Sequence, residues 1–498
     1  MKRPPLPRSV LACLLGAASV LGFAPFGIFP LPVLALAWLF RLWRQAGTPR
    51  GAAWLGFCYG LGGFLAGVSW VYVSLADVGG MAAPLAVVAT LLFCAYLALF
   101  PALAGYFSHR LASADFFWRG VPAWAAIWTL AEWLRGWAFT GFPWLAIGYS
   151  QTPPSPLSGF AAALGVYGVG FLAALIAAAF ALDGRRKATW GLLVSLVASG
   201  ALLRGMDWTQ PVGAPVKVSL LQGNVPQDLK WDPQRLSLSI DTYVRLAQTH
   251  PAPLVVLPET AIPLFFDELP REVLHDLRQS GDLLLGMAVR HRDGGYVNGA
   301  IGIRGEPPGA VSPAPTLGAQ TYAKRHLVPF GEYAPPGFAW FFDLVQIPMS
   351  DFSAGPRLQP PLELAGQKIA PNICYEDLFG AEILDALPQA TLLINLSNTA
   401  WFGDSLAQPQ HLQIAQMRAL ETGRTMLRAT NTGITAAIAP DGRVLARLPP
   451  FTTGALVVEA QGFAGLTPYA RWGDALALLL AIGAISPACL AAWRRRSR

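Results

Sequence analysis

The chain has 498 residues, of which 54% are hydrophobic and only 13% are charged. This composition lies far outside the range of soluble globular proteins and predicts a polytopic membrane protein that carries a water-soluble region. The net charge of +7 does not indicate nucleic-acid binding, because the basic residues fall in short clusters between apolar runs. In that position they are typical of residues that orient a protein in a membrane.

Eight apolar segments are mostly close to the ~20 residues that a helix needs to cross a bilayer. They are residues 9–24, 28–43, 51–76, 82–108, 121–137, 158–182, 188–203 and 475–493. The first follows Lys2, Arg3 and Arg8 and resembles a secretory signal peptide, but the equally apolar segments after it favour an uncleaved helix. We therefore predict seven helices before the soluble region and one after it.

The basic clusters fall on alternate connections, so the positive-inside rule places all of them in the cytoplasm. They are Lys2/Arg3/Arg8, Arg41/Arg44/Arg50, Arg110/Arg119, Arg185/Arg186/Lys187 and Arg494/Arg495/Arg496/Arg498. This predicts a membrane domain over residues 1–204, an extracytoplasmic domain over residues 205–473, and a C-terminal helix with a basic cytoplasmic tail over residues 474–498. Both termini are then cytoplasmic.

Polar and aromatic residues gather near the outer end of the fifth apolar segment. Glu132 and Arg135 are three residues apart, which allows an ion pair on one helix face, and we interpret them as structural rather than as a transport site. The surrounding tryptophans are typical of an interfacial aromatic belt, with a lipid-lining groove as the alternative. They are Trp124, Trp128, Trp133, Trp137 and Trp144.

Short apolar runs alternate with amphipathic segments in the soluble region. Strands are predicted at 216–221, 254–257, 282–289, 296–303, 321–324, 369–374, 391–396, 434–439, 444–448 and 455–459. Helices are predicted from Asp232 onward, at 270–278, near Ala381 and at 408–426. This alternation indicates an α/β layered domain, with a Pro/Gly-rich surface loop at 307–315.

Cys374 is the candidate nucleophile, because it stands where a predicted strand ends. The other cysteines, Cys13, Cys58, Cys94 and Cys489, lie in apolar segments, so Cys374 has no disulfide partner in the soluble region. A lone cysteine after an apolar run is by itself more typical of a small buried core residue. Two other strand ends favour the catalytic interpretation.

Glu259 and Lys324 also stand at predicted strand ends, where reactive groups of α/β sheets collect. A thiol of ordinary pKa is mostly protonated at about pH 7, so a cysteine nucleophile needs a base and a nearby cation. Glu259 is suited to be the base. Lys324 is suited to be the cation and to donate to the oxyanion that forms when a carbonyl is attacked. Each residue alone is more typical of a solvated surface charge.

The chain order of Glu259, Lys324 and Cys374, with the residues around them, resembles the nitrilase superfamily of carbon-nitrogen hydrolases. Within it, the chain is similar to the membrane-bound branch, the apolipoprotein N-acyltransferases. The motifs are Leu257-Pro258-Glu259-Thr260, residues 322–333, Ile373-Cys374-Tyr375-Glu376, residues 395–403, and in the helices residues 23–27 and 141–144. The resemblance implies an αββα sandwich, and it makes Glu259 the general base, Lys324 the oxyanion stabiliser and Cys374 the acyl-accepting thiol.

The resemblance also implies four supporting residues. Glu332 is the second active-site carboxylate, which orients Lys324, and Tyr375 and Glu376 flank the nucleophile. Trp231 lies on a loop beside the substrate entrance. By residue type alone, Glu376 is equally suited to the first turn of a helix, and Trp231 to the core.

Residues 334–355 are too apolar for an ordinary loop. The run contains Phe338, Trp340, Phe341, Phe342, Leu344, Val345 and Ile347. We expect it to dip into the outer leaflet and guide a lipid to Cys374, with packing against the domain's own core as the alternative.

By resemblance, the expected reaction is acyl transfer from a glycerophospholipid, through a thioester on Cys374, to the N-terminal amine of a diacylglyceryl-cysteine lipoprotein. The expected location is the bacterial inner membrane, with the catalytic domain in the periplasm. Two alternatives stay open. One is a membrane-tethered amidase or nitrilase that hydrolyses a small amide, and the apolar loop and eight helices argue against it. The other is a transporter with an outer binding domain, which the scarcity of charge inside the helices argues against.

No metal or other cofactor is expected. The six histidines never fall within five residues of one another, a spacing that does not suggest a metal site. They are His109, His250, His275, His291, His326 and His411.

Overall fold

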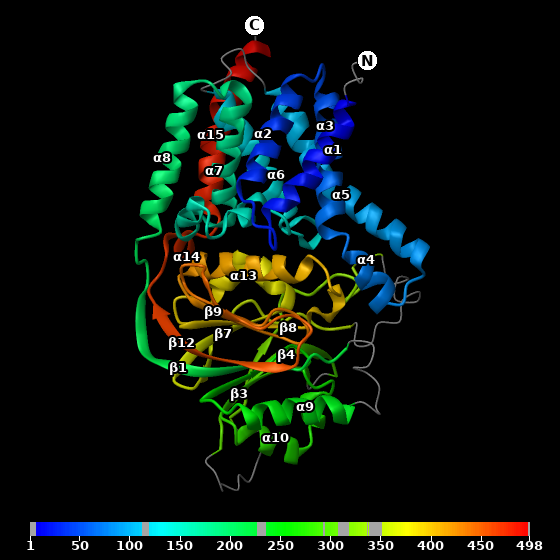
Figure 1. The fold of residues 1–498 in the computed structure, drawn as a ribbon, viewed down its shortest axis with the longest axis vertical. Helices are drawn as coiled ribbons and strands as arrows, with labels where there is room; N and C mark the ends of the chain where they lie inside the picture. The colour runs from blue at the N-terminus through cyan, green and yellow to red at the C-terminus, as the bar shows by residue number, and fades with distance from the viewer. Residues whose placement is uncertain are drawn as a thin grey trace.

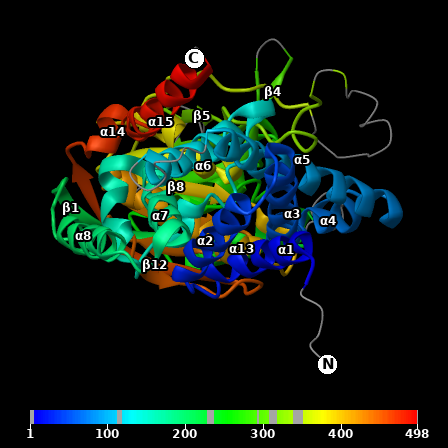
Figure 2. The ribbon, with the colours of Figure 1, turned by 90° about the horizontal axis from the view of Figure 1, so that it is seen from above.

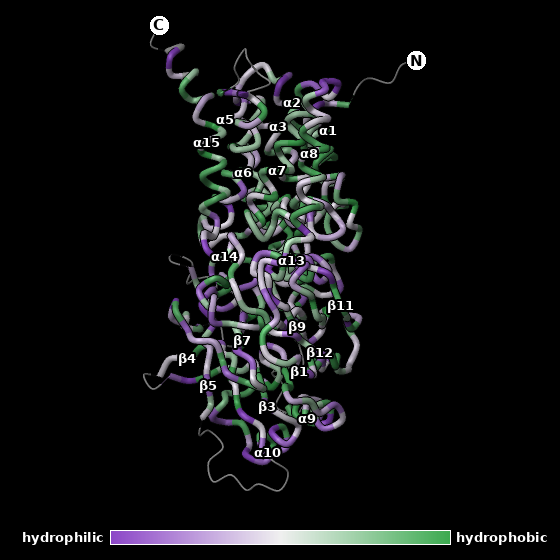
Figure 3. Tube along the Cα trace, turned by 90° about the vertical axis from the view of Figure 1, so that its left-hand side faces the viewer, coloured by the Kyte–Doolittle hydropathy of each residue, from purple (hydrophilic) through white to green (hydrophobic). Residues whose placement is uncertain are grey.

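The computed structural model describes residues 6–111, 119–226, 236–291, 294–306, 318–335, 337 and 351–496. A bundle of helices stacks on an α/β sandwich along the long axis of the molecule (Figure 1). Helix α1 begins and helix α15 ends at the same end of the bundle, far from the sandwich (Figure 1), and the two helices lie on opposite sides of the bundle when it is seen from above (Figure 2). Hydrophobic residues are concentrated in the bundle (Figure 3), as the composition predicts.

Each predicted apolar segment forms a helix in the described part of the chain. The helices are α1 (Arg8–Ser19), α2 (Pro30–Arg44), α3 (Pro49–Val68), α5 (Ala83–Arg110), α6 (Val121–Arg135), α7 (Ala161–Asp183), α8 (Lys187–Leu203) and α15 (Ala475–Arg496). Three are long and apolar enough to cross a membrane, namely Pro49–Val68, Ala83–Arg110 and Pro156–Asp183, and shorter apolar helices include Arg8–Gly22, Lys187–Leu203 and Ala475–Ala491. The apolar helical region is thus confirmed, and eight crossings stay a prediction.

The third apolar segment is not the single helix that we predict from its composition. Helix α3 ends at Val68, and the chain continues as the short helix α4 (Val71–Val73) and a π-helical turn, η2 (Ser74–Val78). The hydroxyl of Ser74 donates to the carbonyl of Trp401 at 2.7 Å. A contact with the sandwich therefore holds this end of the segment, which apolar composition cannot reveal.

The aromatic-belt prediction is wrong for three of the five tryptophans. Trp124, Trp128 and Trp144 are at most 6% exposed and pack inside the molecule. The Trp124 ring lies 5.4 Å from Phe40, edge to face, a geometry that aromatic pairs favour. Trp137, in contrast, is 54% exposed and fits the prediction.

The sandwich contains two sheets of six strands each in the described residues. The first has the order β12-β1-β2-β3-β4-β5 and the second β11-β10-β9-β8-β7-β6. The first is built from β1 (Gln210–Gln222), β2 (Leu254–Leu257), β3 (Asp282–Arg290), β4 (Tyr296–Ile303), β5 (Gln320–Ala323) and β12 (Gly454–Ala464). The second is built from β6 (Leu362–Leu364), β7 (Gln367–Ile373), β8 (Leu392–Ser397), β9 (Thr425–Thr430), β10 (Ala436–Ile438) and β11 (Val444–Arg447).

Helices cover the outer face of each sheet and complete the predicted αββα order. Residues such as Leu220, Val256 and Leu427 fill the space between the sheets. Helices α9 (Leu236–Thr249) and α10 (Arg271–Arg278) pack on the first sheet. Helices α12 (Gly380–Ile383) and α13 (Ala407–Thr422) pack on the second. Burial on both faces explains why the central strands read as continuous apolar runs.

The predicted helix over residues 408–426 is wrong at its C-terminal end. Helix α13 stops at Thr422, and Gly423 takes a left-handed conformation with φ 61° that terminates it. Strand β9 begins at Thr425 and pairs in parallel with β8. The apolar residues of β9 continue the helical pattern, so only the pairing with β8 reveals the strand.

Helix α13 lies between the second sheet and the helical bundle (Figure 1). The main-chain N–H of Ala24 donates to Gln413 of α13 at 3.0 Å, and that of Val166 donates to Glu421 at 2.7 Å. These hydrogen bonds join the bundle to the sandwich. As a result, the sandwich edge next to α13 faces the bundle.

Candidate active site

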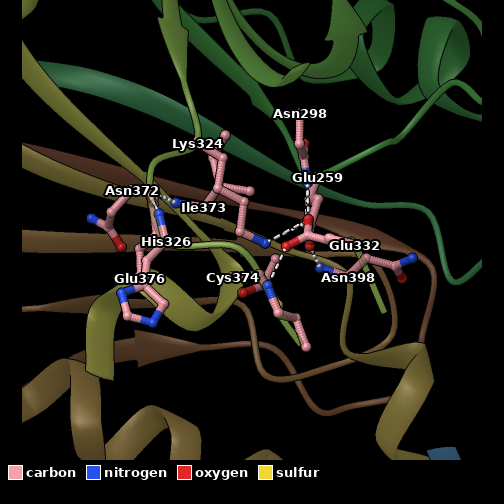
Figure 4. A network of polar contacts seen from close by, with 12 residues as sticks. Glu259, Asn298, Lys324, His326, Glu332, Asn372, Ile373, Cys374, Glu376 and Asn398 are labelled. Carbon is pink, nitrogen blue, oxygen red and sulfur yellow. Dashed lines mark hydrogen bonds and ion pairs between the residues drawn. The ribbon is translucent and has the colours of Figure 1, made fainter. Parts of the chain in front are cut away.

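Three predicted site residues meet at the carboxyl ends of strands from both sheets (Figure 4). Glu259 follows β2, Lys324 follows β5 of the same sheet, and Cys374 follows β7 of the other sheet. All three are buried, at 6%, 1% and 7% exposure. The backbone of β3 lies close to the backbone of Glu259. A Cβ atom added to Gly286 of β3 would be only 2.6 Å from the Cα of Glu259.

The ammonium of Lys324 is held between two carboxylates. Its Nζ donates to Glu332 Oε1 at 2.9 Å and to Glu259 Oε1 at 3.4 Å. The other oxygen of Glu332 accepts from the main-chain N–H of Val328 at 2.8 Å. Glu332 therefore lies where the prediction puts the second carboxylate, against the lysine.

Asn298 on β4 also bridges the two carboxylates. Its side-chain nitrogen donates to Glu259 and to Glu332, each at 2.8 Å, and the second oxygen of Glu259 accepts from the main-chain N–H of Asn398 at 2.8 Å. The sequence reasoning missed Asn298. The available signal was a single amide side chain in an otherwise apolar strand, and buried amides of this kind usually hydrogen-bond another polar group.

Cys374 occupies a strained turn between β7 and a short 3-10 helix, η8 (Cys374–Leu378). Its φ is +53°, a left-handed conformation that costs a non-glycine residue on the order of 1–3 kcal/mol. Such a conformation persists only where neighbouring groups enforce it. The turn presents the residue at the end of the strand, a placement like that of the nucleophilic serine in the sharp strand-to-helix turn of α/β-hydrolases.

The Glu376 carboxylate supports this turn, together with the Asn395 amide, which donates to the carbonyl of Cys374 at 3.1 Å. One oxygen accepts from the main-chain N–H of Ile373 at 2.7 Å. The other accepts from the N–H groups of Arg325 at 2.7 Å and His326 at 3.2 Å. Both oxygens accept from the hydroxyl of Tyr322 at 3.0 Å. Glu376 thus ties the segment after Lys324 to the residue before the cysteine, a role beyond the helix-start alternative.

Burial and charge act differently on the lysine and the cysteine. Burial raises the pKa of the Cys374 thiol, and the negative charge of Glu259 raises it further, while Lys324 lowers it in part. Burial opposes the Lys324 ammonium, but Glu332 and Glu259 outweigh it and raise the pKa of Lys324 above its usual value. The resting site therefore holds a neutral thiol beside a permanent cation, so the thiol needs a base.

A second polar cluster lies directly behind the Cys374 turn and was missed by the sequence reasoning. Asp377 accepts from His411 Nε2 at 2.7 Å and from Arg428 at 2.9 Å, and Arg428 donates to His411 Nδ1 at 3.1 Å. Burial and the Arg428 guanidinium lower the pKa of His411. A neutral His411 with its proton on Nε2 satisfies all three contacts. Nothing in the spacing of these residues indicated that they would meet.

Tyr375 links the site to the helical bundle. Its hydroxyl donates to the carbonyl of Gly141 at 2.7 Å, and its ring lies 5.1 Å from that of Phe379. Trp231 and most of the apolar segment 334–355 fall outside the described residues. Within the described part of the chain, no group of three or more His, Cys, Asp or Glu side chains is placed to hold a metal.

Comparison with known proteins places the chain in a family. Residues 15–179 match the apolipoprotein N-acyltransferase N-terminal domain, and residues 217–469 match the carbon-nitrogen hydrolase family. An apolipoprotein N-acyltransferase of Nitrosomonas europaea is 52% identical over 95% of each chain. The chain belongs to the apolipoprotein N-acyltransferase family. The resemblance drawn from the motifs is confirmed.

Other relatives of this family align over nearly the full length. The apolipoprotein N-acyltransferase of Ralstonia nicotianae is 46% identical over 98% of this chain and 93% of its own. That of Chromobacterium violaceum is 45% identical over 98% and 94%. Glu259, Lys324 and Cys374 all lie in the carbon-nitrogen hydrolase region, and the family is enzymatic.

Proposed function

We propose that this family member transfers a fatty acyl group from a glycerophospholipid, through a thioester on Cys374, to the N-terminal amine of a diacylglyceryl-cysteine lipoprotein. The observation that carries the proposal is the buried cluster of Glu259, Lys324 and Cys374, in a chain that aligns end to end with named apolipoprotein N-acyltransferases. A thiol held beside a carboxylate and a cation is suited to accept an acyl group.

The first half-reaction begins with a neutral thiol. Glu259 takes the proton as the sulfur of Cys374 attacks the ester carbonyl, and the C–S bond forms. The resulting oxyanion is stabilised by the ammonium of Lys324, which Glu332 keeps oriented. The tetrahedral intermediate collapses, the C–O bond breaks, and Glu259 returns its proton to the lysophospholipid oxygen. A thioester remains on the enzyme.

The second half-reaction uses the same groups. The amine of the lipoprotein attacks the thioester carbonyl, and Glu259 accepts a proton from the nitrogen. The C–S bond then breaks as the amide forms, and the proton returns to the sulfur of Cys374. Glu259 therefore acts as base and acid in alternation, and no cofactor enters the balance of the two steps.

We also propose eight membrane crossings, with the sandwich on the periplasmic side of the inner membrane and both termini in the cytoplasm. Arginines of two basic clusters contact neighbouring connections at the end of the bundle away from the sandwich: Arg8 donates to the carbonyl of Gln45, and Arg44 to the carbonyl of Leu182. This common end supports a single cytoplasmic face. The same proposal keeps the domain limits at residues 204 and 473.

Reporter fusions test the topology. A reporter placed after Arg186 should be active only in the cytoplasm, and one placed after Gly309 only in the periplasm, because α8 separates the two positions. A third fusion at the C-terminus should match the one after Arg186. Detection of the first two reporters in the same compartment would contradict the eight-crossing arrangement.

The fate of the acyl group distinguishes a transferase from a membrane-tethered hydrolase. A thioester reacts with water as well as amines, so a transferase must keep its acyl-enzyme dry until the acceptor arrives. We expect mass spectrometry to find a fatty acyl adduct on Cys374 that persists without acceptor. A diacylglyceryl-modified peptide with a free N-terminal cysteine amine should discharge it.

The matched control is the same peptide with its amine acetylated, which should leave the adduct in place. Rapid release of free fatty acid in buffer, at a rate that neither peptide changes, would instead favour hydrolysis. An adduct on another residue, or none with phospholipid present, would contradict the role proposed for Cys374.

A further inference from the structure

The loop of residues 141–147, which follows α6, contacts the nucleophile region from the bundle side. The carbonyl of Gly141 accepts from the hydroxyl of Tyr375, the residue next to Cys374. The ring of Phe142 lies 6.4 Å from that of Tyr375, stacked at 28°. On its other side the loop meets α13, where Trp144 Nε1 donates to Gln410 at 2.7 Å. The 141–147 loop therefore covers the nucleophile turn.

Two buried side chains of α6 hold the backbone of the 141–147 loop. The Arg135 guanidinium donates to the carbonyls of Phe142 and Trp144, the latter at 2.7 Å. A carboxylate oxygen of Glu132 accepts from the N–H of Ile147 at 2.9 Å. Arg135 is 2% exposed and Glu132 7%. The sequence predicts a structural ion pair between these two residues. In the structure, both residues instead hydrogen-bond the backbone of the 141–147 loop.

The conformation of the loop explains why it needs this support. Gly141 has φ 85° and Leu145 has φ 59°, and the second value is strained for a residue with a side chain. A Cβ on Gly141 would lie 2.1 Å from the carbonyl oxygen of Gly136, so the chain also turns tightly after α6. Both hydrogen bonds come from one nitrogen, Nη1, at the tip of the arginine side chain. A lysine side chain is one bond shorter, so its ammonium does not reach the two carbonyls.

We propose that Arg135 and Glu132 are positioning residues that hold the 141–147 loop over Tyr375 and so keep water from the acyl-enzyme. This inference rests on the proposed acyl transfer. It means that two residues of helix α6 influence the active site indirectly, through their hydrogen bonds with the loop. Neither residue contacts Cys374, and both act by keeping the cover above it in one conformation.

The test compares full-length Arg135→Lys, Glu132→Ala and Glu132→Gln with the wild type in nanodiscs. In Arg135→Lys, the fraction of the acyl-enzyme that reacts with water rather than with the peptide amine should rise about tenfold, because the two charge-assisted hydrogen bonds from Nη1 to the loop carbonyls are lost. Glu132→Ala should shift in the same direction. Glu132→Gln keeps an acceptor oxygen for Ile147 and should stay close to the wild type.

A second measurement needs no turnover. Iodoacetamide should alkylate Cys374 faster in Arg135→Lys and Glu132→Ala, and amides of the 141–147 loop should exchange hydrogen faster. The matched control is Arg41→Lys, whose guanidinium donates to the carbonyl of Phe180 at 2.9 Å between α2 and α7. It should leave the partition and the alkylation rate unchanged.

A purely structural role would lower acyl loading and transfer in the same proportion and leave partition, exchange and alkylation as in the wild type. That result would overturn the inference. Failure of the wild type to form any Cys374 adduct would instead refute the proposed function, and alkylation and exchange would still decide whether the two residues hold the loop. If Arg135→Lys does not fold, the comparison of Glu132→Ala with Glu132→Gln still tests whether hydrogen bonds from α6 hold the 141–147 loop.

Discussion

Replacement of Cys374 by alanine should lower kcat/KM by at least about 10³-fold, because the acyl group then has no covalent acceptor. The Cys374→Ser variant should lose a similar factor, although it preserves shape in the turn with φ +53°, since an alkoxide is far harder to form than a thiolate. Activity with a lipoprotein peptide, together with intact-mass analysis of the acyl adduct, measures both effects.

The other cysteines supply matched controls within the same chain. Cys13, Cys58, Cys94 and Cys489 are free thiols of the helical bundle, so single alanine replacements should change turnover by no more than about twofold and cost roughly 1 kcal/mol where a small cavity forms. Substantial activity in Cys374→Ala, with a normal melting temperature, would contradict the central assignment.

The second large effect is expected at the base and the cation. Glu259→Gln should slow thioester formation by about 10²–10⁴-fold, because an amide cannot take the thiol proton. Lys324→Met should slow it by about 10²–10³-fold through loss of the oxyanion contact. The second variant also leaves Glu332 and Glu259 buried without their cation, so we expect a destabilisation of about 3–5 kcal/mol. Single-turnover acylation of Cys374 and thermal unfolding separate the two consequences.

Two exposed residues serve as controls for these variants. Glu459 on β12 and Lys368 on β7 point into solvent, so Glu459→Gln and Lys368→Met should acylate at the wild-type rate and unfold normally. An acylation rate in Glu259→Gln equal to that of Glu459→Gln would assign proton transfer to another group. Equal rates in Lys324→Met and Lys368→Met would remove Lys324 from oxyanion stabilisation.

The candidate site illustrates which contacts local sequence can indicate. Glu259 and Cys374 each follow an apolar run, and Lys324 follows the short predicted strand Thr321-Tyr322-Ala323. Contiguous residues are enough to predict such strand ends. Asn298 is marked in the sequence only as a single amide in an apolar strand, and the Asp377–His411–Arg428 cluster carries no local signal. Asp377 and Arg428 are 51 residues apart, and only the parallel pairing of β7, β8 and β9 brings them together.

The sequence by itself determined the apolar helices, the α/β class of the soluble domain and the three strand-end groups, because hydrophobic periodicity and length are properties of contiguous residues. The αββα order of the layers came from the family resemblance of the motifs. Only the tertiary structure decided that β9 is a strand rather than the end of α13. It also decided that Trp144, in the 141–147 loop, faces inward and hydrogen-bonds Gln410 of α13. It also decided that Glu132 and Arg135 hold a loop above the site. The physical reason is that backbone partners and burial depend on which segments pack together, and the free energy of those contacts is distributed over residues far apart in the chain.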